Sequence, residues 1–101
     1  PGEIPAGRAE VVVAAEAAPA GLRVRGARPG DRIAPLGMGG RSRAVRDLLR
    51  EAGVPAGRRD GHPLVVCAAD GEVLWVVGGA QAERTRVGSA TAQVWRLRME
   101  N

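Results

Sequence analysis

Short apolar runs, interrupted by glycine and proline, dominate the chain and predict β-strands. Residues 11–13 form a β-branched run, and residues 22–25 and 92–99 alternate apolar and polar side chains as half-buried strands do. The 22–25 segment would expose its arginines together on one face. Residues 28–31 have the sequence Arg-Pro-Gly-Asp, which is typical of a turn, and residues 32–35 are expected to continue in an extended form.

Two longer apolar runs predict a central hairpin. Residues 63–69 and 72–77 are rich in valine, leucine and alanine, and Asp70-Gly71 between them is a strong signal for a tight turn. Because neither run alternates clearly, we expect both faces of this hairpin to be covered. Gly78-Gly79 would end it, and the polar residues 80–91 predict a loop.

One helix is expected, over residues 43–52. Ser42 is the predicted N-cap, Gly53 would end the helix in a left-handed conformation, and Pro55 prevents its continuation. The N–H groups at the start of such a helix would favour an anion. One helical face would be apolar and a column of arginines would lie beside it. The apolar face consists of Val45, Leu48, Leu49 and Ala52, and the column of Arg43, Arg46 and Arg50.

These elements indicate an α+β fold, a small layered domain of five or six short strands with one main helix. The 101 residues suffice for one such domain, with 45% hydrophobic and 26% charged residues. Because the aromatic residues are two tryptophans only, the core must be mainly aliphatic. We expect residues 1–9 to be a linker or edge segment and residues 10–101 to be the domain, as a piece of a longer protein.

Positive charge is concentrated in the middle of the chain. All fifteen basic residues are arginine, and the formal net charge is +4. Residues 23–59 hold ten arginines against three carboxylates, a local charge of +7 that favours an acidic partner. A genome rich in G and C would also favour arginine over lysine, so the bias has two explanations. The absence of lysine excludes a lysine nucleophile or phosphate clamp in this chain.

Other kinds of site have little support. One cysteine and one histidine exclude an internal disulfide framework and a multi-Cys/His metal cluster. The Gly37–Gly40 loop lacks the spacing of a dinucleotide fingerprint and the lysine of a Walker A loop, so we expect a flexible loop. We interpret His62 as a turn or surface residue, Cys67 as an inert buried thiol, and both tryptophans as core. No apolar run reaches the roughly 20 residues of a membrane span, and a cytoplasmic location is expected.

Several motifs across residues 20–79 occur in an order that resembles a known family. They are Leu22-x-Val24-Arg25, Pro29-Gly30-Asp31-Arg32-Ile33-x-Pro35-x-Gly37, Val45-x-Asp47-Leu48-Leu49, Val54-Pro55 with Arg59, Pro63-Leu64-Val65-Val66, and Asp70-Gly71-Glu72-x-x-Trp75-Val76-x-Gly78. In this combination they resemble the C-terminal domain of bacterial tRNA(Ile)-lysidine synthetase.

The resemblance implies a role in tRNA processing. Enzymes of this family use ATP, with Mg²⁺, to join lysine to the wobble cytidine of tRNA(Ile), and their N-terminal catalytic domain carries a Ser-Gly-Gly-x-Asp-Ser loop. No such loop occurs in this chain. The resemblance therefore implies that this domain has no cofactor and that ATP belongs to the parent ligase. The C-terminal domain, similar in fold to a domain of the phenylalanyl-tRNA synthetase β subunit, would hold the tRNA acceptor stem.

Together, the charge pattern and the resemblance predict a non-catalytic tRNA-binding domain, with tRNA(Ile) and the other domains of its enzyme as partners. Because tyrosine and phenylalanine are absent, contact with RNA would depend on arginine and the phosphate backbone. We expect the guanidinium groups to converge into one cationic platform. The predicted nucleic-acid-binding residues are Arg25, Arg28, Arg32, Arg41, Ser42, Arg43, Arg46, Arg50, Arg58 and Arg59.

Two other interpretations stay open at this point. The domain could dock on the rest of its own enzyme, with its arginines meeting acidic surfaces and no direct contact with RNA. A self-contained enzyme is the third interpretation, although no catalytic set can be assembled from these residues. Binding of the chain to tRNA would favour the RNA-binding interpretation, and binding to the remainder of the enzyme without tRNA would favour the docking interpretation. The sequence leaves the oligomeric state undetermined.

Overall fold

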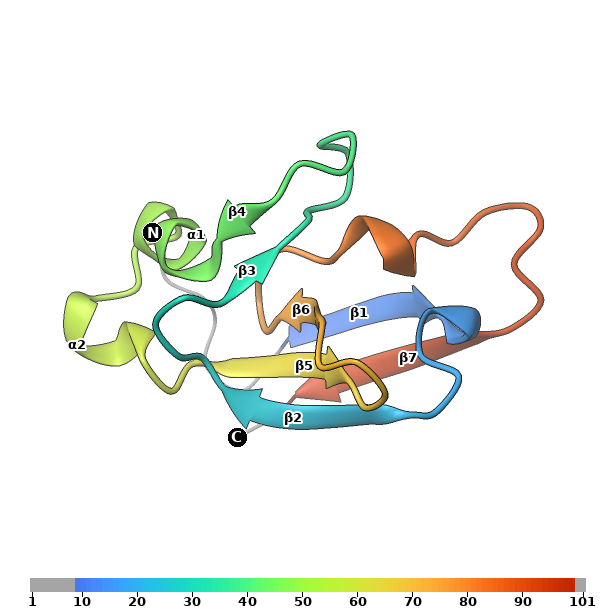
Figure 1. Ribbon diagram of the computed structural model, residues 1–101, viewed down its shortest axis with the longest axis horizontal. Coiled ribbons are helices and arrows are strands. Elements are labelled where there is room, and N and C mark those ends of the chain that lie inside the picture. The colour runs from blue at the N-terminus through green and yellow to red at the C-terminus, as the bar shows by residue number, and fades with distance from the viewer. Residues whose placement is uncertain (1–8, 100–101) are drawn as a thin grey trace.

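Residues 9–99, the part of the chain that the computed structural model describes, form one three-stranded and two two-stranded β-sheets with short helices (Figure 1). The strands in this range are β1 Ala9–Ala14, β2 Leu22–Gly26, β3 Arg32–Ile33, β4 Arg43–Ala44, β5 Pro63–Cys67, β6 Val73–Val76 and β7 Val94–Met99. The helices are α1 Val45–Glu51 and α2 Ala56–Arg59, with 3-10 turns η1 Ala15–Ala17 and η2 Glu83–Thr85. The predicted α+β class is confirmed.

The predicted hairpin forms β5 and β6 of the three-stranded sheet, whose order is β2-β5-β6, so β5 is the central strand and β6 is an edge strand. β5 pairs antiparallel with β2 on one side and with β6 on the other. All of β6 is buried, as are residues 64–67 of β5. The expectation that both faces are covered is therefore confirmed. The Asp70 carboxylate holds the turn by accepting a hydrogen bond from the backbone N–H of Glu72 at 2.9 Å.

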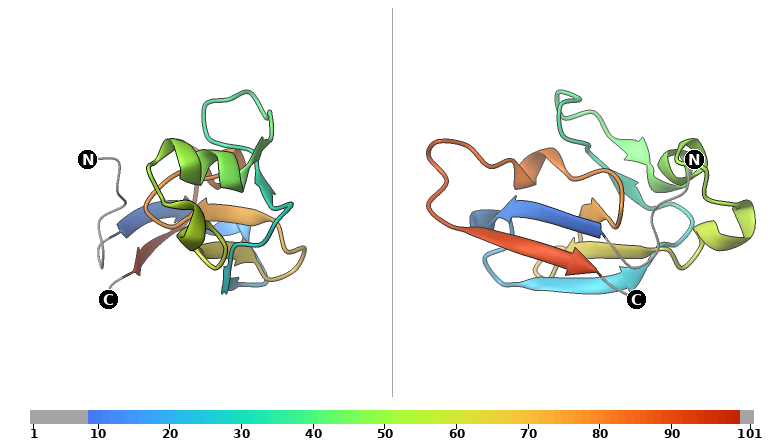
Figure 2. Two further views of the ribbon diagram at one scale, coloured as in Figure 1. Left: turned by 90° about the vertical axis from the view of Figure 1, so that its left-hand side faces the viewer. Right: turned by 180° about the vertical axis from the view of Figure 1, so that it is seen from behind.

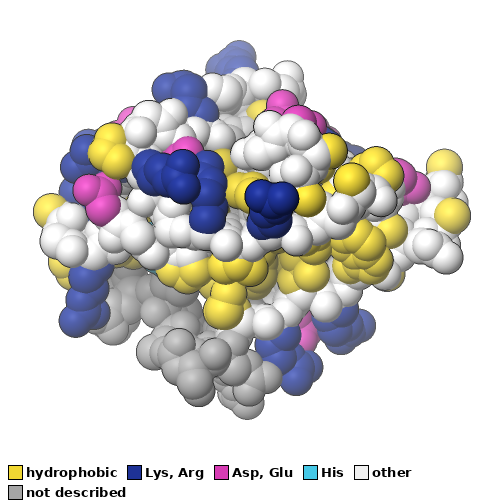
Figure 3. All heavy atoms as spheres, turned by 60° about the horizontal axis from the view of Figure 1, so that its bottom comes forward, with side chains coloured by type: hydrophobic (Ala, Val, Ile, Leu, Met, Phe, Trp, Pro, Cys, Tyr) yellow, Lys and Arg dark blue, Asp and Glu magenta, His cyan; other side chains and the backbone are white. Residues whose placement is uncertain are grey.

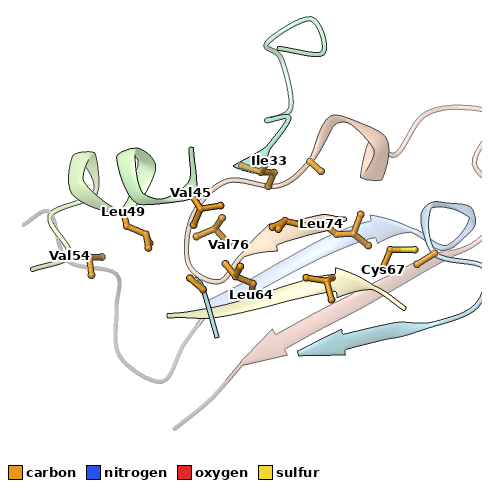
Figure 4. Packing of buried hydrophobic residues seen from close by; sticks show 13 residues of the cluster. Ile33, Val45, Leu49, Val54, Leu64, Cys67, Leu74 and Val76 are labelled. Atoms are coloured by element: carbon orange, nitrogen blue, oxygen red, sulfur yellow. The ribbon is translucent and has the colours of Figure 1, made fainter. Parts of the chain in front are cut away.

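Two hydrophobic clusters lie on the two faces of this hairpin. The larger one packs α1 and β3 against β5 and β6, and Figure 4 shows its side chains pointing toward one another. The smaller one contains Trp75 and is covered by side chains of β1 and β7, which pair antiparallel. Figure 2 shows α1 and the β1–β7 pair against different sides of the hairpin. Alternation along the strands sends neighbouring side chains into different clusters.

The main helix begins later than predicted. Arg43 and Ala44 form β4, which pairs with β3, and α1 starts only at Val45. Ser42 is therefore not the N-cap; Ala44 takes that position with an extended backbone and no side-chain cap. The β3–β4 pairing prevails because it is supported by a tertiary hydrogen bond, from the N–H of Val45 to the carbonyl of Asp31 at 2.9 Å.

The end of the helix agrees with the sequence prediction. Gly53 has a φ of 86°, the left-handed conformation in which glycine is favoured. Its N–H donates to the carbonyl of Arg50 at 3.0 Å. Of the predicted apolar face, Val45 and Leu49 are buried and Leu48 is half-buried.

Two segments differ from the sequence prediction in their burial. The 80–91 segment, expected to be a loop, contains the η2 turn with the fully buried Thr85. The Thr85 hydroxyl donates to the carbonyl of Ala82 at 2.6 Å, which satisfies this buried polar group. In β2, Val24 is 60% exposed although the alternating pattern predicted burial, because β2 lies at the edge of its sheet. Cys67 is buried, as expected.

The two ends of the described chain lie side by side, because Ala9 in β1 is opposite Met99 in β7. The linker predicted over residues 1–9 falls outside the described residues, apart from Ala9 itself. Among residues 9–99, no helix has the length and apolar character needed to cross a membrane.

Candidate nucleic-acid interface

The predicted binding residues belong to one continuous stretch from β2 to α2. α1, β4 and β3 lie in the upper left part of Figure 1 and α2 lies at its left edge, whereas the 86–93 loop lies at the right. The two further views in Figure 2 keep these elements together. The fold therefore holds most of the charged segment at one side. Whether each arginine is available to a ligand depends on its contacts.

Arg25 has a structural role, because its charge is paired with a carboxylate and is not available to a ligand. Its guanidinium donates two hydrogen bonds to the Asp31 carboxylate, both at 2.8 Å. Asp31 also accepts the backbone N–H of Arg28 at 2.7 Å. These hydrogen bonds, with that from Arg25 as the largest contribution, hold the pKa of Asp31 below its ordinary value. The bidentate pair closes the turn between β2 and β3.

Arg43 and Arg50 also have carboxylate partners. Arg43 forms a salt bridge with Glu51, which raises the pKa of the arginine and lowers that of the glutamate. Arg50 lies 3.5 Å from Asp47, one turn away on α1. Because Arg43 belongs to β4, the predicted three-arginine column on the helix is reduced to Arg46 and Arg50.

Arg32 and Arg59 are held by uncharged groups. Arg59 donates to the carbonyl of Val54 at 2.9 Å and so fastens α2 to the chain that follows α1. Arg32 donates from Nε to Ser42 Oγ at 2.6 Å and from Nη2 to the Ser42 carbonyl at 3.2 Å. Ser42 therefore orients Arg32 across the β3–β4 pair, and the charge of Arg32 stays uncompensated.

Five predicted residues are exposed arginines that have no carboxylate within 4.0 Å among residues 9–99. We call them the open arginines: Arg28, Arg32, Arg41, Arg46 and Arg58. Arg23 on β2 meets the same criteria and was missed by the prediction. On the face shown in Figure 3, basic side chains stand in separate groups with hydrophobic ones between them. Three of the predicted arginines, Arg25, Arg43 and Arg50, have carboxylate partners. The convergence of the open arginines into one platform stays a prediction.

Hydrogen bonds within the fold weaken two possible anion sites. The N–H of Val45, the first residue of α1, already donates to the carbonyl of Asp31, so this donor is not available to an anion. The Gly37–Gly40 loop leads into β4 rather than into a helix. The Glu83 carboxylate accepts the N–H of Gly37 at 3.0 Å, which places negative charge at that loop.

A shallow groove of about 240 Å³ opens beside the β3–β4 pair. Its floor is made of buried apolar residues from β3, β6 and the chain before η2. Arg32 and Ser42 line it on one side, and Glu72 and Arg84 line it from the β5–β6 turn and η2. Positively charged, negatively charged and neutral polar side chains therefore surround an apolar floor.

Arg84, which sequence analysis missed, joins three parts of the fold. It donates to the carbonyl of Ala17 from Nε at 3.0 Å and from Nη2 at 2.7 Å. Its Nη1 donates to Asp70 at 2.8 Å and also to Glu72, and Nη2 lies 3.3 Å from Cys67 Sγ. The pKa of Asp70 falls to about 2, through the backbone hydrogen bond from Glu72 first and Arg84 second. No local pattern reveals this role, because Ala17 is 67 residues away.

The chain is similar to known proteins in sequence. The family described as the TilS substrate C-terminal domain matches residues 22–99. A tRNA(Ile)-lysidine synthase of Symbiobacterium thermophilum is 43% identical over 79 residues, which cover 78% of this chain and 16% of that protein. The tRNA(Ile)-lysidine synthase of Geobacter sulfurreducens is 39% identical over 85 residues, with 82% and 17% covered. The chain thus spans 16% to 17% of the length of these relatives.

The structural comparison agrees. A solved structure described as the crystal structure of a TilS C-terminal domain has a TM-score of 0.73 and 32% sequence identity. The alignment covers 93% of this chain and 70% of the solved one. The predicted resemblance is confirmed by both comparisons. With a family match over residues 22–99 and a fold shared with a solved member, this chain belongs to the family of TilS C-terminal domains of tRNA(Ile)-lysidine synthase.

Proposed function

We propose that this chain is the non-catalytic, tRNA-holding domain of a tRNA(Ile)-lysidine synthase, and that it binds the acceptor stem through phosphate contacts. The observation that carries the proposal is the set of open arginines, whose guanidinium groups are exposed and lack carboxylate partners within residues 9–99. Each can donate two parallel hydrogen bonds to a phosphate. Family membership supplies the class of nucleic acid, a tRNA.

The open arginines come from different elements of the fold, between β2 and α2. In this proposal they meet successive phosphates of a duplex backbone rather than a single anion. The anchored neighbours keep that surface in place: Arg25 and Asp31 fix the turn that carries Arg28, and Arg59 holds the helix that carries Arg58. Phosphate contacts position an RNA without reading its sequence.

In this proposal the chemistry belongs to the rest of the enzyme. ATP, Mg²⁺ and lysine would bind outside the 22–99 family match, and the ligation to tRNA(Ile) would occur there, in the cytoplasm. The contribution of this domain is binding energy and orientation. Its affinity alone can be modest, because linked domains that bind one RNA raise each other's effective concentration.

A salt titration of RNA binding tests the proposal. The affinity for an RNA hairpin that copies the tRNA(Ile) acceptor stem, measured by fluorescence anisotropy, should fall with salt. Each phosphate contact adds about 0.7–0.9 to the steepness of log affinity against log salt. The variant Arg41→Ala/Arg46→Ala should therefore bind more weakly and lose about 1.4–1.8 of that slope, because two contacts disappear.

The matched control removes the same charge elsewhere. Arg86→Ala/Arg96→Ala deletes two surface arginines that have carboxylate partners, Glu83 and Glu10. Its slope and affinity should stay close to those of the unmodified chain. Equal losses in both double variants would contradict a localised interface, and a salt-independent affinity would contradict phosphate binding altogether.

The edge of β2 favours a second candidate function, docking on another domain of the same enzyme. Among residues 9–99 no strand pairs with this edge of β2, and Val24 on it is 60% exposed, beside the exposed Arg23. An unpaired edge with an apolar side chain is a surface that other proteins can contact. Failure of the chain to bind the RNA hairpin, together with binding to the remainder of its enzyme, would favour docking over RNA contact.

A further inference from the structure

We infer that the groove beside the β3–β4 pair binds one unpaired nucleotide of RNA, with its phosphate at Arg32 and its base toward Arg84. This inference rests on the proposed function, because it assigns a second contact with the same RNA. The open arginines outside the groove would hold a duplex, and the groove would hold a nucleotide that leaves the duplex.

Arg32 provides the chemistry for the phosphate. A guanidinium has five N–H donors, and Ser42 uses only two of those on Arg32, at 2.6 Å and 3.2 Å. Within residues 9–99 no carboxylate lies within salt-bridge distance of this arginine. Three donors and an uncompensated charge therefore remain for phosphate oxygens. The two bonds from Ser42 also hold the side chain in place before the ligand arrives, which lowers the entropic cost of binding.

Arg84 offers the opposite chemistry. All five of its N–H donors are used: two by the carbonyl of Ala17, one each by the carboxylates of Asp70 and Glu72, and one by Cys67 Sγ. Two carboxylates also offset its charge, so little remains to attract a phosphate. What stays available is the flat face of the guanidinium, a surface on which unstacked bases stack.

The size and the apolar floor of the groove fit a single nucleobase. Ile33, Val73 and Ala82, which are 2%, 7% and 4% exposed, form this floor. The volume of about 240 Å³ is below the roughly 300–1,000 Å³ of pockets for drug-sized ligands, so the groove takes a smaller fragment. Glu72 Oε2 accepts a hydrogen bond from Arg84, whereas Oε1 has no hydrogen bond within the described chain. Oε1 can therefore accept a hydrogen bond from an N–H of a nucleobase.

Three RNA hairpins test the inference with the 101-residue chain. One ends in a blunt base pair, and the other two carry one unpaired nucleotide at the 3′ end or the 5′ end. We expect one of the extended hairpins to bind about tenfold more tightly than the blunt one, the size of effect that one stacked base produces. Ala34→Leu places a larger side chain in the groove and should remove this difference while blunt-hairpin binding stays unchanged. Ala20→Leu, at an exposed turn outside the groove, is the matched control and should keep it.

The outcomes separate this inference from the proposed function. If the unmodified chain binds all three hairpins equally and with a clear salt dependence, the groove inference is overturned and the proposed function stands. If it binds none of them at any salt concentration, the proposed function is overturned as well. Retention of the tenfold difference by a folded Ala34→Leu variant would also overturn the groove inference.

A second measurement needs neither a variant nor duplex binding. Cytidine 5′-monophosphate is added to the nitrogen-15-labelled chain, and the amide chemical shifts are followed by NMR. Shifts concentrated at Ala34, Ser42 and Ala82, with none at Ala20, are expected. Shifts that are absent, or spread evenly over the surface, overturn the inference, and they do so even where Ala34→Leu fails to fold.

Discussion

An arginine in this chain either supports the fold or remains open to a ligand, and its neighbours in space decide which. Arg25 is neutralised by Asp31, six residues away. Arg84 has partners 14 and 67 residues away, whereas Arg41 has no carboxylate partner within the described chain. In the sequence, Arg25 and Arg41 belong to one basic block, because the sequence shows local charge and not the partners that each side chain meets in space. Substitution of an anchored arginine therefore tests the fold, and substitution of an open one tests the ligand.

Arg84→Met should destabilise the domain markedly. The change removes the donors for the carbonyl of Ala17 and leaves Asp70 and Glu72 without their cation, at a cost of about 2 kcal/mol in the free energy of unfolding. Urea denaturation followed by tryptophan fluorescence measures this cost. Arg86→Met is the matched control, since its salt bridge with Glu83 is exposed and should contribute less to stability than the contacts of Arg84 do. Equal stability of the two variants would contradict a structural role for Arg84.

At the scale of elements, the three-stranded sheet depends on a close approach between the end of β2 and the turn before β5. Gly26 ends β2, and a Cβ atom there would lie 2.9 Å from the Cα of Gly61. Ala27 bonds to both sides of this turn, donating to the carbonyl of His62 and accepting from the N–H of Gly61, each at 2.8 Å. The sequence marked residues 22–25 as a strand but gave no sign of this contact, which joins segments more than 30 residues apart.

Gly26→Ala should lower the free energy of unfolding by about 1–3 kcal/mol, because the added methyl group meets backbone that cannot move freely. Thermal denaturation followed by circular dichroism measures the loss. Gly57→Ala in α2 is the comparison, since a Cβ atom there would meet nothing within 4 Å. That variant should be neutral or about 0.4–1 kcal/mol more stable, through the lower entropy of the unfolded chain. A stable Gly26→Ala protein would show that the two backbones can separate without cost.

At the scale of the whole molecule, α1 with β3 packs on one face of the β5–β6 hairpin and the β1–β7 pair packs on the other. Ionised carboxylates form hydrogen bonds and salt bridges that connect separate segments of the chain. Asp31 closes the β2–β3 turn, Asp70 binds Arg84, and Glu83 binds Arg86 and the N–H of Gly37. The pKa of Glu83 is lowered to about 2, first by the hydrogen bond from Arg86 and then by that from Gly37. The pKa values of Asp31 and Asp70 are lowered as well.

The domain should therefore lose stability in acid. A carboxylate whose pKa is lower in the folded than in the unfolded state stabilises the fold above its unfolded pKa, and this contribution is lost as pH falls through the folded pKa. From ordinary values of 3.8 and 4.5 to folded values of about 2, the loss should fall between about pH 4.5 and pH 2. The thermal midpoint should be nearly constant from pH 5 to 7 and drop across that window. Glu83→Gln should reduce the drop, and a midpoint that rises in acid would contradict this account.

The sequence by itself determined the fold class, the central hairpin, the end of α1 and the family. These depend on local rules: alternation of side chains, the Asp70-Gly71 turn, the left-handed Gly53 and the order of motifs. Only the tertiary structure decided that Arg43 and Ala44 pair with β3 instead of entering the helix, which arginines stay open, and that a groove forms beside Arg84. Those features depend on hydrogen bonds and ion pairs between residues far apart in the sequence, whose distances exist only once the chain has folded.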